Sequence, residues 1–389
     1  MLNLKCKIEI EIKRKDTTKI VSFDYVNSIE IKTSRSNLTD TATIKVSGKM
    51  HRKGESLESL LKKEDKVTIQ IGYEEYGLQP VFTGYLTGIK NDDTILELSC
   101  ENEMYWLKTD YMVNPGKIED IKKFFQRNLW DKKYKTCGEI FFYGINIERK
   151  MKMSQVLDLI KKKYPYLKFY FKEGVFCAVE EGTPDTDKEA IIFDPSRNMI
   201  SNKLKYEKSE SKKNCVRAIS MLDNLDVLLA YTPEKGWEDL PFRRNDNAGF
   251  QVYAPEYTDS EDYKMSVVAK GYTEERLECH ECKTQEDLQK YVEKIAENKN
   301  AARISGSFIA FGIPFVRKGD IVKLQDKGKE WNNKQFIVEE VEYKFGVPPA
   351  KGGGGSGGGD TGSAGGGGAS GGSTGGGYRQ TITLGREIK

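Results

Sequence analysis

Residues 2–12 alternate without a break between apolar and polar side chains. One phase holds apolar or thiol side chains and the other holds asparagine and charged ones: Leu2, Leu4, Cys6, Ile8, Ile10 and Ile12 against Asn3, Lys5, Lys7, Glu9 and Glu11. A period of two over this length predicts a β-strand with one buried face and one solvated face. The beginning of the chain is therefore expected to fold as part of a sheet.

Short strand-like runs continue this pattern over residues 28–32, 41–46, 67–71, 81–89 and 94–100. Turn-forming residues such as Asn91-Asp92-Asp93 separate several of them. Short strands this closely spaced predict a small antiparallel barrel or sandwich over residues 1–109. One short helix is expected inside it, over residues 55–63.

The apolar period changes after Asn114-Pro115. Over residues 118–129 apolar side chains recur at intervals of three and four, which predicts an amphipathic helix. A second helix is expected from Ser154 to just before Pro165, followed by a hairpin that turns at Glu173-Gly174. Residues 110–203 are therefore predicted to form an α/β module of a different kind.

Strand patterns return at 215–221 and 227–231, whereas residues 232–262 show no regular pattern. Thr284 is predicted to open a helix, because Thr284 with Asp287 resembles a capping box. Later strands are expected over 305–310, 320–324 and 335–345. In the last of these the apolar phase slips at Glu339-Glu340, which predicts a β-bulge there.

Residues 352–377 contain only Gly, Ser, Thr, Ala and one Asp. Such a segment buries too little apolar area to offset its ordering entropy, so it is predicted to be a flexible tether spanning about 25–30 Å. The strand that follows, over residues 378–384, is expected to pair with 335–345. Two interpretations of the glycine run stay open, a natural hairpin loop and an engineered linker.

Composition limits the partners and the compartment. A net charge of +3 over 389 residues gives no reason to expect nucleic acid or an anionic membrane as an obligatory partner. The first residues lack the apolar core of a signal peptide, and no apolar run approaches the roughly 20 residues that cross a bilayer. The seven scattered cysteines are expected to be reduced and buried. The length predicts two to four domains.

The search for a catalytic constellation finds little. His51 and His280 are the two histidines, and neither lies in a recognisable nucleophile context. There is no phosphate-binding glycine loop outside the low-complexity run. Cys279-His280-Glu281-Cys282 has the spacing of half a zinc site but lacks a second ligand pair, so two loop thiols remain the alternative. We therefore expect no enzyme activity, no cofactor and no metal.

The C-terminal third carries three segments, 312–324, 336–346 and 378–386, that together resemble the late control gene D family of phage tails. Segments 26–31, 38–44 and 81–89 resemble the opening strands of the same family, while residues 110–300 match it only in length and layout. The resemblance implies a tail baseplate hub, similar to the hub of contractile phage tails and to the N-terminal part of type VI secretion spike proteins.

This resemblance implies a mainly β fold with α+β insertions and two small antiparallel β-barrels per chain, assembled as a trimer into a pseudo-hexameric ring. The division that follows is 1–109 for the first barrel, 110–203 for the α/β module, 204–231 with 303–389 for the second barrel, and 232–302 for an inserted module. Structural or interface roles are expected for nine residues, the first two at a turn of the first barrel: Gly84, Tyr85, Gly312, Pro314, Gly319, Asp320, Ile382, Leu384 and Gly385.

As a hub, the protein would adapt a sixfold tail tube to a threefold spike and line the central channel of a virion or tail-like particle assembled in the bacterial cytoplasm. Its expected partners are two further copies of itself, the tail tube protein, a separate spike protein and baseplate wedge proteins, with tape-measure protein or DNA in the channel. Insertion of this chain into a membrane is not expected. The competing hypotheses are a tail-associated cell-wall hydrolase and a glycan-binding receptor protein.

Overall fold

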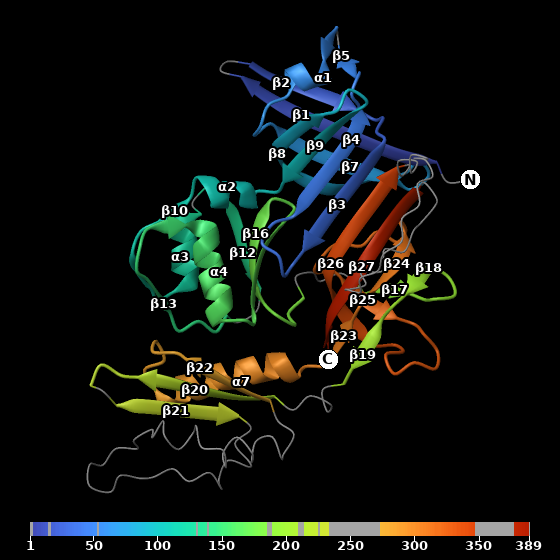
Figure 1. The fold of residues 1–389 in the computed structure, drawn as a ribbon. Coiled ribbons are helices and arrows are strands. Elements are labelled where there is room, and N and C mark those ends of the chain that lie inside the picture. The colour runs from blue at the N-terminus through green and yellow to red at the C-terminus, as the bar shows by residue number, and fades with distance from the viewer. Residues whose placement is uncertain are drawn as a thin grey trace, which may run out of the picture.

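The computed structural model describes residues 3–14, 17–52, 54–129, 131–137, 140–184, 189–208, 214–224, 226–232, 273–346 and 377–388. Four units can be followed in Figure 1, and we name them by their place in the chain. The N-half and the C-half are rich in strands, the middle module lies beside both, and the inserted module lies below the middle module. Residues 232–262, for which the sequence shows no pattern, lie almost wholly outside the described residues.

The N-half is built from consecutive segments. Its strands and its short helix are β1 (Leu4–Arg14), β2 (Thr17–Phe23), β3 (Ser28–Ser34), β4 (Thr41–Ser47), β5 (His51–Arg52), β6 (Glu55–Ser56), α1 (Leu57–Leu60), β7 (Lys66–Tyr73), β8 (Gly77–Asn91) and β9 (Ile95–Glu101). The alternation predicted for β1 is confirmed from Cys6 to Ile12, where Cys6, Ile8, Ile10 and Ile12 are buried and the residues between them face outward. Leu4, expected on the buried face, is 38% exposed.

The C-half gathers strands from three separate stretches of the chain. They are β17 (Ile191–Phe193), β18 (Met199–Asn202), β19 (Lys205–Glu207), β23 (Arg303–Ser305), β24 (Ser307–Phe311), β25 (Ile321–Leu324), β26 (Gln335–Gly346) and β27 (Gly377–Ile388). The predicted pairing of the last two strands is confirmed, and so is the bulge, because the register shifts between Phe336 and Glu340. The β26–β27 pairing continues to Gly346 opposite Gly377, so residues 347–376 connect the two strands of a hairpin.

The middle module contains three helices and small sheets. Its elements are α2 (Met104–Thr109), β10 (Met112–Val113), β11 (Gly116–Ile118), α3 (Ile121–Asn128), β12 (Lys133–Cys137), β13 (Ile145–Ile147), β14 (Met151–Lys152), α4 (Met153–Lys163), β15 (Leu167–Lys172) and β16 (Val175–Glu180). The two predicted helices correspond to α3 and α4, and the predicted hairpin is β15–β16, with Glu173 and Gly174 at φ 52° and 76° in its turn.

The inserted module pairs β20 (Asn214–Met221) with β21 (Val227–Thr232) and with β22 (Thr273–Glu278), and helix α7 (Gln285–Asn300) packs on this sheet. The predicted cap is confirmed, since the Thr284 hydroxyl accepts a hydrogen bond from the backbone N–H of Asp287. The strand pairing differs from the division expected from sequence, which grouped 204–231 with the second barrel. β20 and β21 belong with α7, and β17 and β18 belong to the C-half.

The fold is mainly β, with α+β units beside one large, almost entirely antiparallel sheet. Apart from β5 and β6, which pair with each other, the described strands of both halves join in this 15-stranded sheet, whose main path runs β18-β24-β27-β26-β3-β4-β9-β8-β7-β1-β2. Among the described strands this path does not close on itself, so two separate barrels and a ring remain proposals. One apolar core spans both halves, and a second core spans the middle and inserted modules. No helix within the described residues is both long and apolar enough to cross a membrane.

Candidate assembly site: the seam between the two halves

The two halves are joined by backbone hydrogen bonds between β3 and β26, and we call this junction the seam. Its antiparallel register runs from Ser28 opposite Gly346 to Ser34 opposite Glu340. In Figure 1 the two strands lie side by side, with β4 continuing the sheet on one side and β27 on the other. The N-terminal part of β26 instead pairs with β25, so a single strand changes partner along its length.

The two faces of the seam have opposite chemistry. On one face, alternate residues of both strands are buried in the shared core, namely Ile29, Ile31, Val341, Tyr343 and Phe345. On the other face opposite charges stand directly across from each other, with Lys32 facing Glu342 and Lys344 facing Glu30. Both faces favour this register. A shift by one residue would turn the core side chains outward, and it would also separate the oppositely charged cross-strand pairs.

A buried ion pair lies at the end of the seam. The Lys318 Nζ of the C-half lies 2.6 Å from both carboxylate oxygens of Asp40 of the N-half and donates to the backbone oxygen of Ser34. Asp40 also accepts from the backbone N–H of Ser34 and from the side chain of Asn102. Burial raises the pKa of Asp40, and the Lys318 ammonium opposes that rise. The pair joins the two halves, and removing either partner would leave the other charge buried without a counter-ion.

Among the described residues Arg35 is the largest polar side chain that is fully buried, and it links the N-half, to which it belongs, with the middle module and the C-half. Its guanidinium donates to the Tyr170 hydroxyl and the Thr183 backbone oxygen of the middle module, and to the Glu339 carboxylate of β26. The Lys318 ammonium lies 5.1 Å from the centroid of the same Tyr170 ring. The middle module is therefore held against the seam by charged groups that water does not reach.

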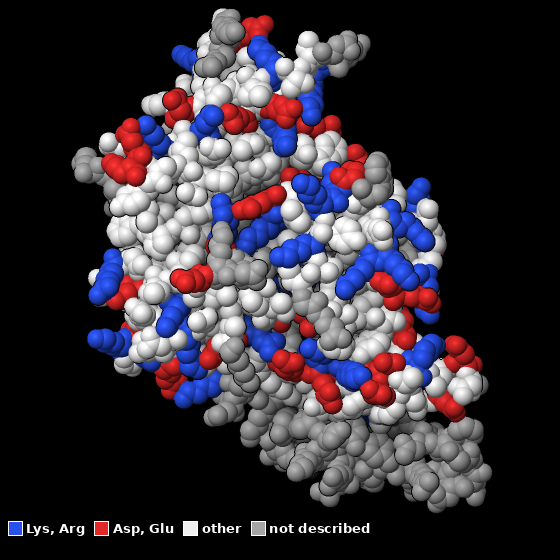
Figure 2. Space-filling model, turned by 180° about the vertical axis from the view of Figure 1, so that it is seen from behind, with Lys and Arg blue, Asp and Glu red and all other residues white. Residues whose placement is uncertain are grey.

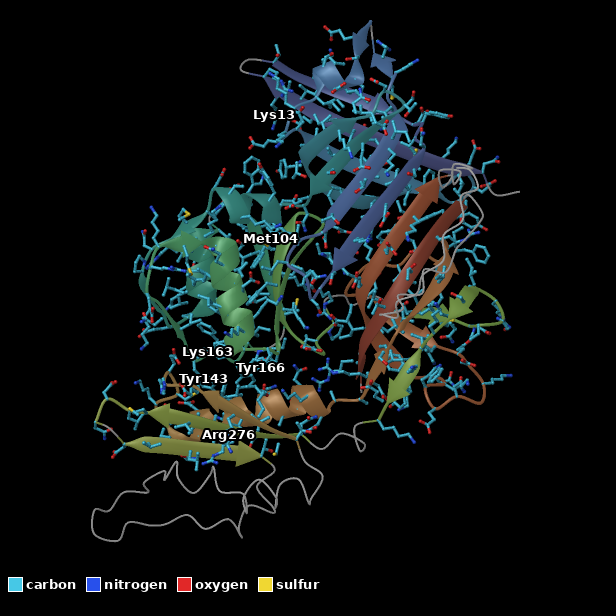
Figure 3. All side chains as sticks on the ribbon, in the orientation of Figure 1. Lys13, Met104, Tyr143, Lys163, Tyr166 and Arg276 are labelled. Carbon is cyan, nitrogen blue, oxygen red and sulfur yellow. The ribbon has the colours of Figure 1, made fainter. Side chains whose placement is uncertain are left out.

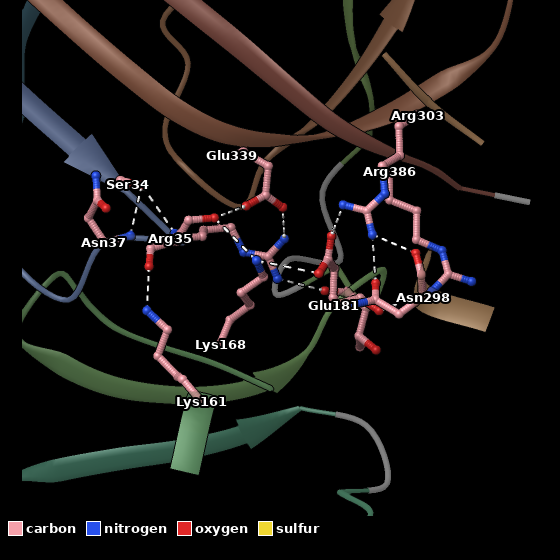
Figure 4. A network of polar contacts seen from close by, with 12 residues as sticks. Ser34, Arg35, Asn37, Lys161, Lys168, Glu181, Asn298, Arg303, Glu339 and Arg386 are labelled. Carbon is pink, nitrogen blue, oxygen red and sulfur yellow. Dashed lines mark hydrogen bonds and ion pairs between the residues drawn. The ribbon is translucent and has the colours of Figure 1, made fainter. Parts of the chain in front are cut away.

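Figure 4 shows the neighbouring contacts that tie in the inserted module. The Glu181 carboxylate accepts from Arg303 at 2.6 Å and lies 3.4 Å from the Lys168 Nζ. Arg303 also donates to both oxygens of Asn298 on α7, and Arg386 on β27 pairs with Glu297 at 2.6 Å. Burial alone would raise the pKa of Glu181, but Lys168 and Arg303 reverse the effect, so this pKa lies below its usual value.

Seven of the nine residues predicted from sequence cluster in the C-half next to the seam. Gln380 on β27 holds the loop that carries several of them, accepting from the Val316 N–H and donating to the backbone oxygens of Phe311 and Pro314. Gly319 has φ 80°, and its N–H donates to the backbone oxygen of Val338. The Asp320 carboxylate closes the turn by accepting from the backbone N–H of Arg317. A Cβ at Gly312 would lie 1.9 Å from the Tyr378 ring. The others are Ile382 and Leu384, both buried, and Gly385, where a Cβ would lie 2.4 Å from the Glu339 side chain.

Gly84 and Tyr85 lie elsewhere, and their expected place in a turn is wrong. Both are inside the long strand β8, where Gly84 has an ordinary strand conformation. A Cβ on Gly84 would lie 2.2 Å from the backbone oxygen of Glu101, so the glycine is required by close approach of two strands. Tyr85 stacks edge-on against Trp106 with the ring centroids 5.1 Å apart. Neither residue contributes to the seam.

Sequence reasoning missed Arg35, Asp40, Lys318 and Gln380. Gln380 had a readable signal, because it occupies the buried phase of β27 between Tyr378 and Ile382. The three charged residues stand outside regular strand alternation, and nothing in their spacing brings them together. Their association depends on the pairing of β3 with β26.

A cavity of about 450 Å³ opens beside the buried ion pair, lined by residues of both halves and of the β15–β16 turn, including Lys66, Thr83, Glu173 and Arg317. Its charges are largely paired, as Arg317 with Glu173 at 3.1 Å. Acidic and basic side chains are interspersed over the face shown in Figure 2. Neither feature indicates a specific small-molecule or nucleic-acid site.

The described residues hold no group of three or more His, Cys, Asp or Glu side chains arranged to bind a metal ion. His51 is exposed and bonds to the backbone oxygen of Lys49. The Nδ1 of His280 accepts from the backbone N–H of Met221, and its Nε2 lies 3.6 Å from the Glu278 carboxylate. Neither histidine has a hydroxyl or thiol nucleophile within hydrogen-bond distance among the contacts of the described residues.

No protein-family model matches the sequence, and no curated protein matches it. Solved structures do share the fold. A tail protein from Neisseria meningitidis MC58 is similar with a TM-score of 0.57 and 11% identity, covering 99% of this chain and 97% of that one. The 43 kDa tail protein of prophage MuSo2 from Shewanella oneidensis gives 0.55 and 11%, covering 98% of both chains. A chain of the Francisella PdpA-VgrG complex gives 0.50 and 8%, covering 99% of this chain and 58% of that one.

Proposed function

We propose that this chain is a structural hub subunit of a phage-like tail or contractile injection particle, and that three copies form a ring. The observation that carries the proposal is the match in fold, over nearly the full length of both chains, to two tail proteins. The shared fold suggests a tail protein, and the two halves joined at the seam suggest how copies of the chain could form a ring.

The seam joins two strand-rich halves edge to edge within one chain. Three chains would present six such halves, which lets a threefold ring meet a sixfold tube on one side and a threefold spike on the other. The tail tube protein, a separate spike protein and the wedge proteins of a baseplate are the partners that this geometry suits, with tape-measure protein or DNA in the channel. Its place in the particle would be the baseplate.

The ends of the sheet path give the surfaces on which copies would meet. An uncovered edge strand invites pairing with another chain, so edges are normally protected or paired. β2 at one end exposes 64% of Ile20, and β18 at the other exposes 44% of Ile200. These apolar side chains favour contact between the β2 edge of one copy and the β18 edge of the next.

The test is the mass of the purified protein by native mass spectrometry and light scattering, alone and mixed with its tube protein. We expect a species of three times the 44.2 kDa chain. Ile20→Lys and Ile200→Lys are each expected to weaken that species. Tyr76→Lys, at a 62% exposed side chain away from both ends of the path, is the matched control and should leave it intact.

A monomer at every concentration, with and without tube protein, would contradict the proposal. A trimer that both edge substitutions leave unchanged would contradict the assigned contact between the β2 and β18 edges, because the copies would then meet through other surfaces. Clearing of a cell-wall suspension by the purified chain would favour the hydrolase hypothesis instead. Selective binding on a glycan array would favour the receptor hypothesis.

A further inference from the structure

Two cysteine thiols meet where β22 ends and the loop to α7 begins. The sulfur atoms of Cys279 and Cys282 are 3.1 Å apart and hydrogen-bonded, and both side chains are fully buried. No other pair among the seven cysteines is recorded in sulfur–sulfur contact. From sequence alone, this pair could be half of a metal site or two ordinary loop thiols. The contacts around the sulfurs favour a third role.

The backbone holds the two sulfurs in place. Cys279 donates its N–H to Ile219 as the continuation of the β20–β22 pairing, and Cys282 donates its N–H to the backbone oxygen of Cys279 to close a turn. The Ser220 hydroxyl donates to the backbone oxygen of Cys282 at 2.7 Å. A disulfide requires sulfurs about 2.05 Å apart, so closure needs a relative movement of only about 1 Å.

The environment makes one of the two thiols the better nucleophile. The hydrogen bond from Cys282, assisted by the nearby Lys163 ammonium, lowers the pKa of Cys279. The same hydrogen bond and burial raise the pKa of Cys282. The contrast with the isolated cysteines is clear, because burial raises the pKa of Cys6 to about 11 and that of Cys100 to about 12. A thiolate beside a thiol is the arrangement that reacts with oxidants and then forms a disulfide.

A metal site does not fit the same residues. Tetrahedral zinc needs four ligands. The Nδ1 of His280 accepts from the Met221 N–H and its Nε2 lies 3.6 Å from the Glu278 carboxylate, and the described residues hold no group of three metal-binding side chains at the thiols. Glu281 is turned instead to the Lys163 ammonium of α4, with which it is paired. The described residues therefore supply two ligands only.

The pair lies under the contact between the middle and inserted modules. Figure 3 places Tyr143 and Lys163 at the lower edge of the middle module, facing the layer of β20–β22 and α7. Tyr291 of α7 crosses this contact, because its hydroxyl donates to the backbone oxygen of Lys163. With both sulfurs buried beneath these side chains, access favours a small oxidant over a bulky disulfide.

We propose that Cys279 and Cys282 form a redox-active dithiol that hydrogen peroxide converts to a disulfide. The Cys279 thiolate attacks one peroxide oxygen, the O–O bond breaks, and hydroxide leaves, which gives a sulfenic acid on Cys279. The Cys282 sulfur then attacks that sulfenic sulfur and displaces its hydroxyl group, which leaves as water with the Cys282 S–H proton. The proton that Cys279 lost on ionising neutralises the hydroxide of the first step. In total two thiols and one peroxide give one disulfide and two waters. This inference does not depend on the proposed hub function.

The experiment uses the full-length chain and a convenient property of its sequence. Trypsin cleaves after Arg276 and Lys283, so both cysteines fall in the single peptide 277–283. The folded protein is treated with a stoichiometric amount of hydrogen peroxide, denatured, alkylated and digested. We expect this peptide to be lighter than its reduced, unalkylated form by two hydrogen atoms and to carry no alkyl group, whereas the other five cysteines become alkylated. Prior reduction with a phosphine should restore alkylation of both thiols.

Two variants test the assigned roles. In Cys282→Ser the sulfenic acid on Cys279 has no second thiol, so a sulfenic-acid probe should label Cys279. In Cys279→Ser we expect Cys282 to react at least tenfold more slowly than Cys279 does in the other variant. Equal oxidation of all seven cysteines, or peptide 277–283 remaining fully alkylated after peroxide, would overturn the proposal. Both overturning outcomes are measured on the wild-type chain, so they do not require that either variant fold.

Discussion

The N-half and the C-half share one sheet and one apolar core, but the chain builds them differently. In the N-half most paired strands are close in sequence, as β1 with β2 and β8 with β9. In the C-half β17 pairs with β25 and β19 with β23, across the inserted module. Pairing between distant segments has a larger loop-closure cost and forms late. We infer that the C-half depends more on the polar side chains that fix its loops and neighbours.

The largest loss of folding stability is expected from a substitution where the two halves meet. Asp40→Asn leaves the Lys318 ammonium, whose side chain is 5% exposed, without its counter-ion. Breaking a buried ion pair from one side costs about 3–5 kcal/mol, measurable as a shift of the urea midpoint followed by tryptophan fluorescence. Adding Lys318→Met should recover part of the loss. Glu74→Gln breaks the exposed Lys5–Glu74 pair inside the N-half and should change stability far less, because water screens both charges. Similar effects for both variants would remove the distinction.

A buried polar group inside the C-half is next. Gln380→Leu leaves the Val316 N–H and the backbone oxygens of Phe311 and Pro314 without their partner, at a cost of about 1–3 kcal/mol. Amide hydrogen exchange at Val316 should accelerate strongly, while exchange along β1 of the N-half should not change. Ile382→Val on the same strand is the control for altered packing alone. Unchanged exchange at Val316 would show that the glutamine does not hold the loop.

The contacts outside the sheet should depend on pH. The pKa of Glu181 lies below its usual 4.5, so its carboxylate stabilises the fold fully above that pH and loses the effect as the pH falls through the lower folded value. Glu181→Gln should therefore lower stability at pH 7 by about 1.5–3 kcal/mol, the range for hydrogen bonds to charged groups. The difference from wild type should shrink below pH 4.5 in thermal melts. A difference independent of pH would mean that packing, not charge, is responsible.

The last expected loss of stability lies in the N-half and rests on backbone spacing. Gly84→Ala places a Cβ 2.2 Å from the Glu101 backbone oxygen, whereas Gly88→Ala on the same strand meets its nearest atom at 3.5 Å. Overpacking of this kind costs about 1–3 kcal/mol, and the second substitution should be nearly neutral. Thermal melting of both variants gives the comparison. Equal melting temperatures would show that β8 and β9 can separate locally.

The sequence predicts those features that depend on the period of one segment. The buried phase of β1, the bulge in β26, the β26–β27 hairpin and the Thr284 cap all follow from residues close to one another, and the structure confirms them. The choice of partner for β3 does not follow, because alternation tells which face of a strand is buried and not which strand lies at its edge. For the same reason β20 and β21 were assigned to the wrong neighbours.

The candidate site shows the same limit. The glycines and Pro314 beside the seam could be found because a conformational constraint marks them individually. Arg35, Asp40 and Lys318 could not, since each is an ordinary charged residue until the fold brings it out of water. Their positions depend on contacts between residues separated by up to 304 positions.

The change of partner along β26 also has a mechanical meaning. Because one continuous strand pairs with β25 at its beginning and with β3 at its end, the halves share an unbroken backbone element and have no loop between them at which to bend. A force along the strands would load the hydrogen bonds of the seam in shear, all at once, which is the direction in which a sheet resists most. The N-half and the C-half should therefore move as one rigid plate under load.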